Sequence, residues 1–451
     1  MKRAVLMSVL LAGCVAKPPP NAAPAPPAAA NAPFIGAPDT ERVPDEWWRL
    51  YGDQALDGHV ARALAANRDI RIAVATLDAA RANARLAGAN RTPDVVLVSG
   101  ASPTTRGTNQ PSTVSVPKSS FELGAEVMWE VDLFGRLRNQ SSAASADAQA
   151  AMAARDGVRL AVVADTVGAY LELCWANELA MTAARQIDLQ RRQVETVQRQ
   201  LQAGDVSLLE LEQARQLLSR LQAGLPAFEA DAQRARYMLA NLEGLPPASG
   251  SLFQCRRPPA IAGALPAGDG AALLARRPDI REAERRLAAA GARVKVASAE
   301  MYPRISLGAS GGLIAGAVDA FITPLISWSF INPARIKARM ALAQASQEGA
   351  LAQYDAAWLR ALREVESAIA DVDAERRINQ SLAAATLDAR GAARRAETRV
   401  AIGDANPLIA LDARRTAFDA ELQSRLSDRR LAQRQIMLFR TLGGGWETPD
   451  P

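Results

Sequence analysis

The sequence has very little of what catalytic and metal sites are made from. It contains one His and three Cys among 451 residues, and their positions leave no spacing that could hold zinc. It also contains no GxSxG, P-loop or HExxH pattern. No metal site, cofactor or catalytic group can therefore be named, and we do not expect an enzyme.

Aromatic side chains are also scarce, at 5% of the residues, which argues against a large aromatic core. Basic and acidic residues nearly balance, at 53 against 48, and the net charge of +5 is spread along the chain. Nucleic-acid binding would require clustered basic residues, so we expect no nucleic-acid partner. The apolar content of 49% nevertheless excludes wholesale disorder.

The N-terminus has only a short apolar run. Residues 4–12 follow Lys2-Arg3, and a helix that crosses a bilayer needs ~20 apolar residues, so this is an export signal rather than an anchor. Residues 11–14, Leu-Ala-Gly-Cys, resemble the lipobox of bacterial lipoproteins. That resemblance implies a signal peptide over 1–13, lipidation of Cys14, and sorting to the outer membrane because Val15 follows. The alternative is a Cys that happens to lie near a signal peptide.

Residues 14–45 form the predicted link between the lipid and the folded body. Most of this segment is Pro and Ala, a composition that builds neither a helix nor a core and is typical of a semi-extended tether.

The rest of the chain contains the same unit twice. Residues 69–97 align without a gap on residues 279–307. The match resumes further on, where the two members of every matched pair are separated by the same number of residues. The later pairs include Trp129 with Trp328, Gly204 with Gly403, and Gly244 with Gly443. Chance matching of abundant Ala does not explain that constancy. We therefore predict one structural repeat over 46–250 and a second over 251–443, with a short tail at 444–451.

The strongest β pattern is residues 121–133, in which apolar and mostly acidic residues alternate. Period two places the apolar set on one face of a strand. The strand is either half buried in a soluble sandwich or part of a membrane barrel, with lipid on the apolar face. The barrel interpretation makes four acidic residues candidates for the lumen: Glu122, Glu126, Glu130 and Asp132. Residues 95–98, 305–307 and 320–330 are the other predicted strands.

Long helices fill most of each repeat. Residues 56–87 predict one helix, and residues 136–203 contain no Pro and could extend about 100 Å at ~1.5 Å per residue. A narrow apolar seam typical of a coiled coil runs through Leu160, Val163, Val167, Tyr170 and Cys174. The helices then reverse. Gly204 and Gly403 can end the two long helices, and Ser207 and Asn406 can cap the next ones.

Four strands are too few to close a barrel, since even small ones use about eight. In lipid an open sheet edge is costly, so the strands of one chain must be completed by other chains in a symmetric ring. Three copies would supply twelve strands.

Three stretches resemble the TolC-type outer-membrane efflux factors, specifically the lipoprotein branch that includes OprM and NodT. They are the midpoint residues 276–307 (RRPDI to YPRISL), the strand-to-helix junction 132–138 (DLFGRLR), and the opening around Trp48 and Gly52-Asp53. The resemblance implies an α+β membrane protein: a homotrimer whose twelve-stranded outer-membrane β-barrel is continuous with a periplasmic α-helical barrel. It also implies a periplasmic adaptor and an inner-membrane pump as partners.

The resemblance carries over to few residues. It places Asp412 at a periplasmic gate and makes the two reversals the tips that meet the adaptor. The tip residues are Gly204, Asp205, Ser207, Gly403, Asp404 and Asn406. An Arg that many members carry after the second Gly is replaced here by Ala405, which puts the usual gate contacts in doubt. The alternative for Asp412 is a solvated carboxylate on a helix face.

These features favour a passive outer-membrane exit duct for small toxic compounds, anchored by lipid and driven by a pump. The same duct could instead serve type I secretion of proteins or peptides, which the sequence does not separate from efflux. A periplasmic coiled-coil lipoprotein without a pore is a more distant alternative. Cys174 and Cys255 could pair in an oxidising compartment, or be a buried small side chain and a linker residue. We favour the unpaired interpretation.

Replacing Cys14 by Ser tests the lipoprotein prediction. Because the thiol is the acylation site, Cys14→Ser should abolish labelling of the protein with a radioactive fatty acid in cells. Unchanged labelling of the variant would contradict the assignment.

Overall fold

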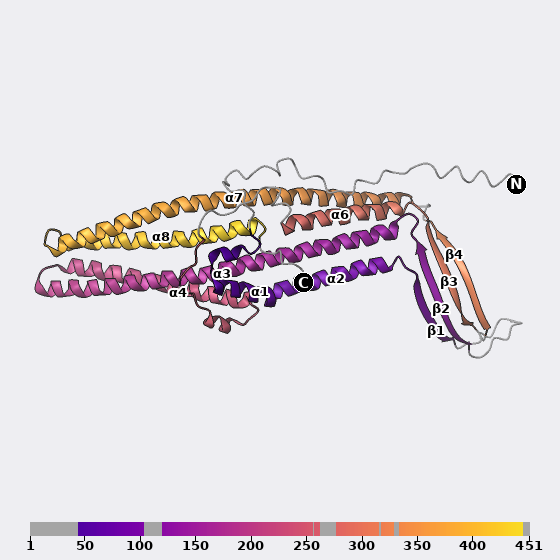
Figure 1. Cartoon of the computed structure of the whole chain (residues 1–451), viewed down its shortest axis with the longest axis horizontal. Coiled ribbons are helices and arrows are strands. Elements are labelled where there is room, and N and C mark those ends of the chain that lie inside the picture. The colour runs from indigo at the N-terminus through magenta and orange to yellow at the C-terminus, as the bar shows by residue number, and fades with distance from the viewer. Residues whose placement is uncertain are drawn as a thin grey trace. The chain divides into compact units, whose positions relative to one another are not determined.

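The computed structural model describes residues 44–102, 120–255, 257–261, 277–314, 317–328 and 333–444. The predicted signal peptide, Cys14 and nearly all of the tether lie outside the described residues, as does the tail after residue 444. Within the described ranges the chain is mainly helical with four strands (Figure 1).

The order of elements occurs twice, with closely matched lengths. Helices α2 (Arg68–Ala89) and α6 (Pro278–Ala299) each have 22 residues and precede a strand pair. The strand pairs are β1 (Asp94–Ser102) with β2 (Ser120–Val131), and β3 (Arg304–Ile314) with β4 (Ala317–Ser327). Next come α3 (Arg136–Ala203) and α7 (Pro333–Ala401), with 68 and 69 residues. Helices α4 (Leu208–Leu242) and α8 (Pro407–Thr441) both have 35. The internal duplication is confirmed.

One helix prediction was wrong. Residues 56–87 belong to two helices, α1 (Gln54–Ala66) and α2, which are separated at Asn67. The Asn67 side-chain oxygen accepts the backbone N–H groups of Asp69 and Ile70, at 2.9 and 3.1 Å, and so caps α2. Its amide donates to the carbonyl of Leu242 at the end of α4, at 3.0 Å. A single buried side chain therefore ends one helix, begins the next and holds both to a third.

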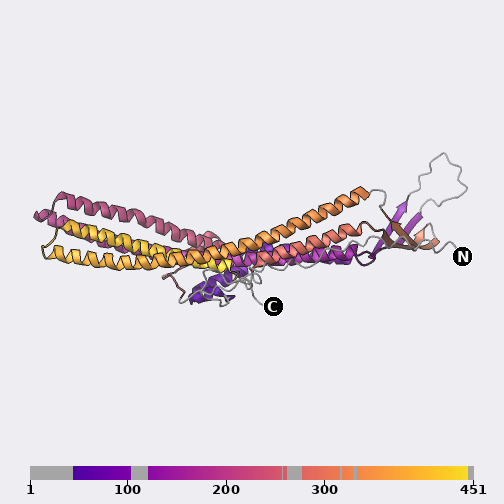
Figure 2. The same ribbon diagram turned by 90° about the horizontal axis from the view of Figure 1, so that it is seen from above.

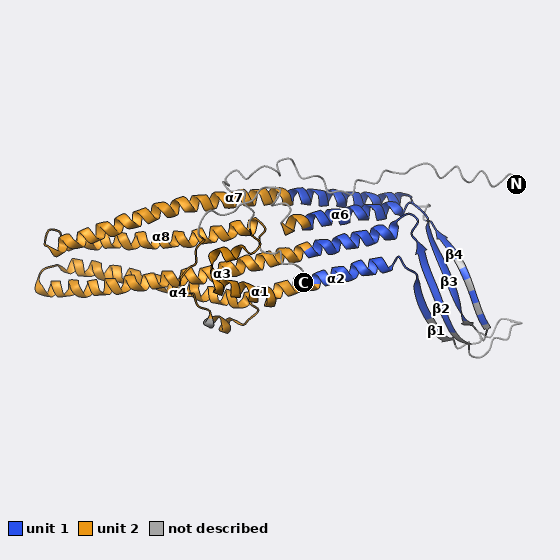
Figure 3. Cartoon of the chain, in the orientation of Figure 1, with its two compact units in different colours: residues 1–25, 76–152, 282–356 blue, residues 26–75, 153–281, 357–451 orange. Residues whose placement is uncertain are grey.

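The chain divides into two compact units, and each takes residues from both repeats (Figure 3). The first contains residues 76–152 and 282–356, which include all four strands. The second contains residues 26–75, 153–281 and 357–451. The duplicated halves are thus intertwined.

In the first unit the four strands form one antiparallel sheet in the order β1-β2-β3-β4 (Figure 1). The duplication is visible in a repeated hydrogen bond. The Trp129 indole N–H donates to the carbonyl of Arg91, before β1, and the Trp328 indole N–H donates to that of Met301, before β3. The two distances are 3.0 and 3.2 Å. In both halves, this bond ties the C-terminal end of the second strand of the pair to the residues that precede the first strand.

In the second unit α3 and α4 form one helical hairpin and α7 and α8 form another. The two views agree that both reversals lie at the same end of this unit (Figures 1 and 2). There Val197, Leu211 and Ala214 of the first hairpin pack with Leu411 of the second in one buried cluster.

A group of short segments, called the collar here, packs against the other end of these hairpins. It consists of η2 (Trp47–Tyr51), α1, η3 (Pro247–Leu252) and the residues that follow η3. Buried Trp47 stacks on Phe439 of α8 with ring centroids 4.7 Å apart. His59 of α1 lies 2.5 Å from the carboxylate of Glu243, and burial lowers the pKa of this imidazole. These contacts hold the N-terminal segment onto the ends of α4 and α8.

The preferred interpretation of Cys174 and Cys255 was wrong, because the two form a disulfide. Cys174 lies in α3 and Cys255 follows η3, where the Asn177 amide also donates to the Cys255 carbonyl at 3.0 Å. After α4 ends, the chain passes back across α3. This path brings Cys255 to Cys174, which lies 81 residues earlier in the sequence. The predicted apolar seam is buried, and two of its members contact the collar: Tyr170 donates to Asp53 and Cys174 is bonded to Cys255.

The disulfide gives a direct prediction. Iodoacetamide should label neither Cys174 nor Cys255 in unreduced, denatured protein, and should label both after reduction, as read by mass spectrometry. Cys255→Ser should expose Cys174 to labelling without reductant. The variant should also lose about 4 kcal/mol of stability, the expected contribution of closing a loop of this length, seen as a lower melting temperature. Labelling of both thiols without reduction would contradict the bond.

Candidate functional site

The described residues contain no group of three His, Cys, Asp or Glu side chains that could bind a metal ion. None of the helices in the described ranges is both long and apolar enough to cross a membrane. The features that remain as candidates are the sheet and the two helical reversals.

The sheet has one face that is apolar across all four strands. The register aligns Val95 with Val127, Ala309 and Ile322, and it aligns Leu97 with Ala125, Gly311 and Ala320. Towards the helices, Trp129 aligns with Leu307 and Pro324, and Val131 with Ile305 and Ile326. Several of these side chains are exposed, among them Leu97 at 79% and Ile322 at 77%. Such a large exposed apolar surface indicates an apolar surrounding, as lipid would provide.

The opposite face is mixed. Its polar side chains are Asp94, Glu126, Glu130, Arg304, Ser306, Ser310 and Ser327, with Gly124, Gly308 and Gly312 between them. It also carries the exposed apolar side chains of Val96, Met128 and Leu325. The backbones approach so closely at Gly312 that an added Cβ would lie 2.5 Å from the Cα of Gly124. Its acidic and Ser side chains match the aqueous side of a barrel wall. The apolar face is therefore continuous across the four strands, whereas the polar face is interrupted in β1, β2 and β4.

The four acidic candidates on β2 occupy different positions. Glu122 lies in β2 opposite Gly100, and Glu126 lies opposite Val96. Glu130 also lies in β2, but its carboxylate accepts two hydrogen bonds from the Arg136 guanidinium, at 2.8 and 2.6 Å. Asp132 lies beyond the end of β2, so the predicted strand was two residues too long. Its carboxylate accepts the backbone N–H groups of Leu137 and Arg138, and so it caps α3.

The first reversal closes as the sequence predicts. Gly204 has a φ of +83°, a left-handed conformation that favours glycine, and the Asp205 N–H bonds to the Gln200 carbonyl at 2.9 Å. Ser207 and Glu210 form a capping box at the start of α4. The hydroxyl of Ser207 donates to Glu210, and this bond lowers the pKa of the Glu210 carboxyl. Leu208 and Leu209 are more than half exposed just beyond the turn.

The second reversal has the same backbone conformation as the first, and it also contains an ion pair. Gly403 has a φ of +79°, and the Asn406 side chain accepts the Leu408 N–H at 2.8 Å, with Pro407 at the first helical position. Arg399 pairs with the carboxylate of Asp404 at 2.9 Å and also donates to its carbonyl. The equivalent of Arg399 in the first repeat is Gln200. Sequence reasoning missed this pair, although the spacing of five residues around a helix end could have indicated it.

Arg414 joins the two reversals. Its guanidinium pairs with Glu397 of α7 and donates to the Gln193 side chain of α3 at 2.9 Å. The second hairpin is also linked along its own length by Asn379 with Asp428, Glu375 with Ser427, and Arg390 with Glu421. Polar contacts therefore link α7 with α8, and Arg414 is one of the Arg side chains of α8 that reach the first hairpin.

Asp412 is exposed on α8, one residue past the buried Leu411. Its carboxylate pairs with Arg415 of the same helix at 2.7 Å, and about two thirds of the Asp412 side chain remains in solvent. Its predicted role at a gate stays a prediction.

The capping box predicts a pH dependence at the first reversal. The pKa of the Glu210 carboxyl is lower in the folded state than its ordinary value of 4.5. The ionised carboxylate therefore stabilises the folded tip above pH 4.5, and this stabilisation is lost as the pH falls through the folded pKa. Hydrogen exchange of residues 208–214, corrected for intrinsic rates, should therefore accelerate between pH 7 and about pH 3. Glu210→Gln should remove much of this change and Glu212→Gln should leave it. Equal pH responses of the two variants would contradict the assignment.

The comparisons with known proteins agree with this geometry. The sequence model of the family "Outer membrane efflux protein" matches residues 60–245 and 271–444. The pyoverdine export outer membrane protein OpmQ of Pseudomonas putida is 31% identical, over 99% of this chain and 97% of its own length. The outer membrane protein OprJ of Pseudomonas aeruginosa is 32% identical, over 89% of this chain and 86% of its own.

Among solved structures, the outer-membrane channel OprN superposes with a TM-score of 0.85 at 33% identity. The match covers 96% of this chain and 99% of the OprN chain. The sheet with one apolar face, the matched helical hairpins and these similarities show that the chain is an outer-membrane efflux channel subunit and belongs to the outer membrane efflux protein family.

Proposed function

We propose that three copies of this chain form a passive exit duct across the outer membrane and the periplasm. The observation that carries this proposal is the sheet. It is apolar on one face in all four strands, and β1 and β4 are open edges. Lipid offers no hydrogen bonds to an open edge, so these edges must pair with neighbouring copies. Four strands cannot close alone, whereas three copies supply a barrel of twelve.

The long helices would continue this barrel as an α-helical tube in the periplasm, with Cys14 lipidated and holding the chain at the outer membrane. The duct performs no chemistry, and transport is driven by an inner-membrane pump. A periplasmic adaptor connects the two and contacts the reversals. Their exposed residues include Gly204, Asp205, Ser207, Gly403, Asp404 and Asn406, and exposed Ile402 and Leu208 provide apolar area beside them.

Small molecules are the proposed cargo. The 31% identical relative is named for export of pyoverdine and not for protein secretion. This similarity favours efflux of small molecules over type I secretion of proteins or peptides, although a duct of this shape could serve either. No feature of the sequence identifies the transported compound.

Asp412 is the proposed periplasmic gate. Three carboxylates around a threefold axis would form an anionic ring that repels itself when empty and is bridged when it binds a divalent cation. Arg415 pairs with Asp412 in each chain and would moderate that repulsion. The reversal also carries Ala405 in place of the Arg that the resemblance leads one to expect, so fewer contacts would hold the gate shut.

Conductance in a planar lipid bilayer tests the duct and the gate together. Purified trimers should produce single-channel currents, and well-folded trimers without currents would favour a structural role instead. Asp412→Asn should raise the conductance or weaken its block by Mg²⁺ severalfold. Arg415→Gln should strengthen the block, because it leaves the carboxylate unpaired.

Asp419→Asn is the matched control. This exposed carboxylate lies two turns further along α8 on nearly the same helix face, at a greater distance from the reversal. It should leave the Mg²⁺ block unchanged. A gate elsewhere would be indicated if Asp412→Asn behaved like this control.

A further inference from the structure

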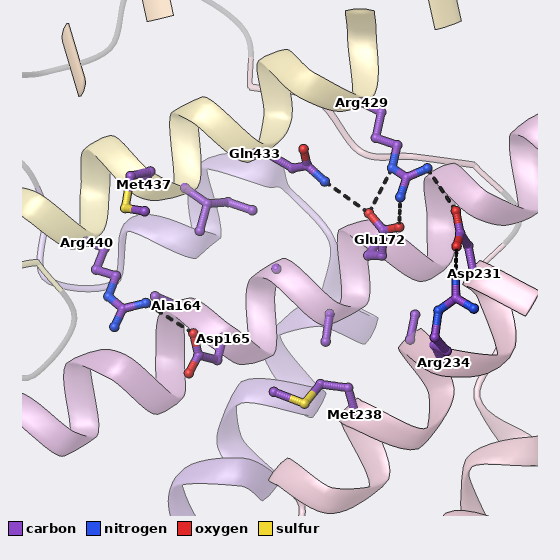
Figure 4. A pocket seen from close by; sticks show the side chains of 14 residues that line it. Ala164, Asp165, Glu172, Asp231, Arg234, Met238, Arg429, Gln433, Met437 and Arg440 are labelled. Carbon is purple, nitrogen blue, oxygen red and sulfur yellow. Dashed lines mark hydrogen bonds and ion pairs between the residues drawn. The ribbon is translucent and has the colours of Figure 1, made fainter. Parts of the chain in front are cut away.

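A cavity of about 480 Å³ lies in the second unit between α3, α4 and α8 (Figure 4). This volume is within the range of sites that bind small organic molecules. Its residues come from three helices and have no assigned role in the gate or at the reversals.

The cavity opens on the face of α3 that points away from the collar. Tyr170 donates its hydroxyl to Asp53 and Cys174 is bonded to Cys255, so these two residues mark the collar side. Gly168 and Glu172 line the cavity and each lies two positions from Tyr170. Two positions are ~200° apart on a helix, which places them nearly opposite the collar. If the collar surrounds the helical tube, the cavity therefore faces the lumen.

The floor of the cavity consists of small residues of α3, among which only Gly168 is partly exposed. Ala164 and Ala169 are buried, and Gly168 between them has open space where a Cβ would stand. Met238 of α4 and Met437 of α8 flank this floor and are 43% and 50% exposed. Thioethers make favourable contacts with aromatic rings, and a helix surface without side chains accepts a planar group.

At one end of the cavity, the largely buried charged side chains sum to one negative charge. Arg429 pairs with both Glu172 and Asp231, and the side chains of all three are about one fifth to one quarter exposed. Two carboxylates thus share one sheltered guanidinium. Arg234 also pairs with Asp231, but its side chain is 69% exposed and water screens its charge more strongly. At the other end Arg440 and Asp165 form a half-exposed neutral pair. A single positive charge on a ligand would balance the sheltered group.

We propose that this cavity binds planar aromatic cations, as a transient site for cargo that moves through the duct. The aromatic body would lie on the Ala164 to Ala169 floor between the two Met side chains, with its charge towards Glu172 and Asp231. The lumenal location rests on the proposed function, whereas binding itself depends only on the cavity.

Fluorescence anisotropy with ethidium tests the site on the full-length protein in detergent. Gly168→Leu fills the floor with a side chain and should weaken ethidium binding about tenfold or more, the effect of losing ~1.4 kcal/mol of binding free energy. Gly224→Leu is the matched control. Gly224 also lies in a helix, in α4, with open space at its Cβ, and it does not line the cavity. Leu favours helix over Gly at both positions, so both variants should fold.

A second pair of measurements tests the charge. Asp231→Asn keeps the size of the side chain and removes one carboxylate, so ethidium should bind more weakly and the anionic dye anilinonaphthalene sulfonate more tightly. The site would be ruled out by ethidium binding that is absent in the wild type or equal in the Gly168→Leu and Gly224→Leu variants. Single-channel currents of the same preparations separate the two proposals, because a duct that conducts but binds no ethidium overturns only this site.

Discussion

The requirement that every backbone hydrogen bond be satisfied in lipid governs the rest of this structure. The sheet of one chain presents an apolar face through all four strands but leaves β1 and β4 unpaired at its edges. A sheet of this kind is stable in a membrane only within a closed ring. The chain must therefore assemble, and the duplicated helical hairpins that follow the strands are brought into a ring by the same closure.

Duplication supplies matched halves that differ in their side-chain contacts. Both reversals use a left-handed Gly followed by a capped helix, because the chain must turn twice at the same end. Of the two described reversals, only the second has an ion pair like that of Arg399 with Asp404. The two hairpins are joined by Arg414 with Gln193, by Arg429 with Glu172 and Asp231, and by the apolar cluster around Leu411. Ion pairs and apolar packing therefore both hold the second hairpin against the first.

Much of this could be predicted from local patterns. Period two in 121–133 predicted the strand and its apolar face, and the helix ends at Gly204 and Gly403 followed from residues within one turn. Two errors arose where a residue far along the chain determines the local structure, and one arose where a helix cap ends a strand. Asn67 breaks a helix-forming run because its amide reaches Leu242, and Asp132 caps α3 instead of extending β2. The pairing of Cys174 with Cys255 depended on the path of the chain after α4, which no spacing records.

By itself, the sequence determined the duplicated order of strands and helices and the family, because these depend on residue types and on periodicity. Only the tertiary structure decided that Tyr170 and Cys174 of the apolar seam face the collar, and that Arg414 links two hairpins. It alone brought Gly168, Met238 and Met437 around one cavity. The physical reason is that such contacts join side chains from helices far apart in the chain, whose relative rotation is set by packing rather than by local sequence.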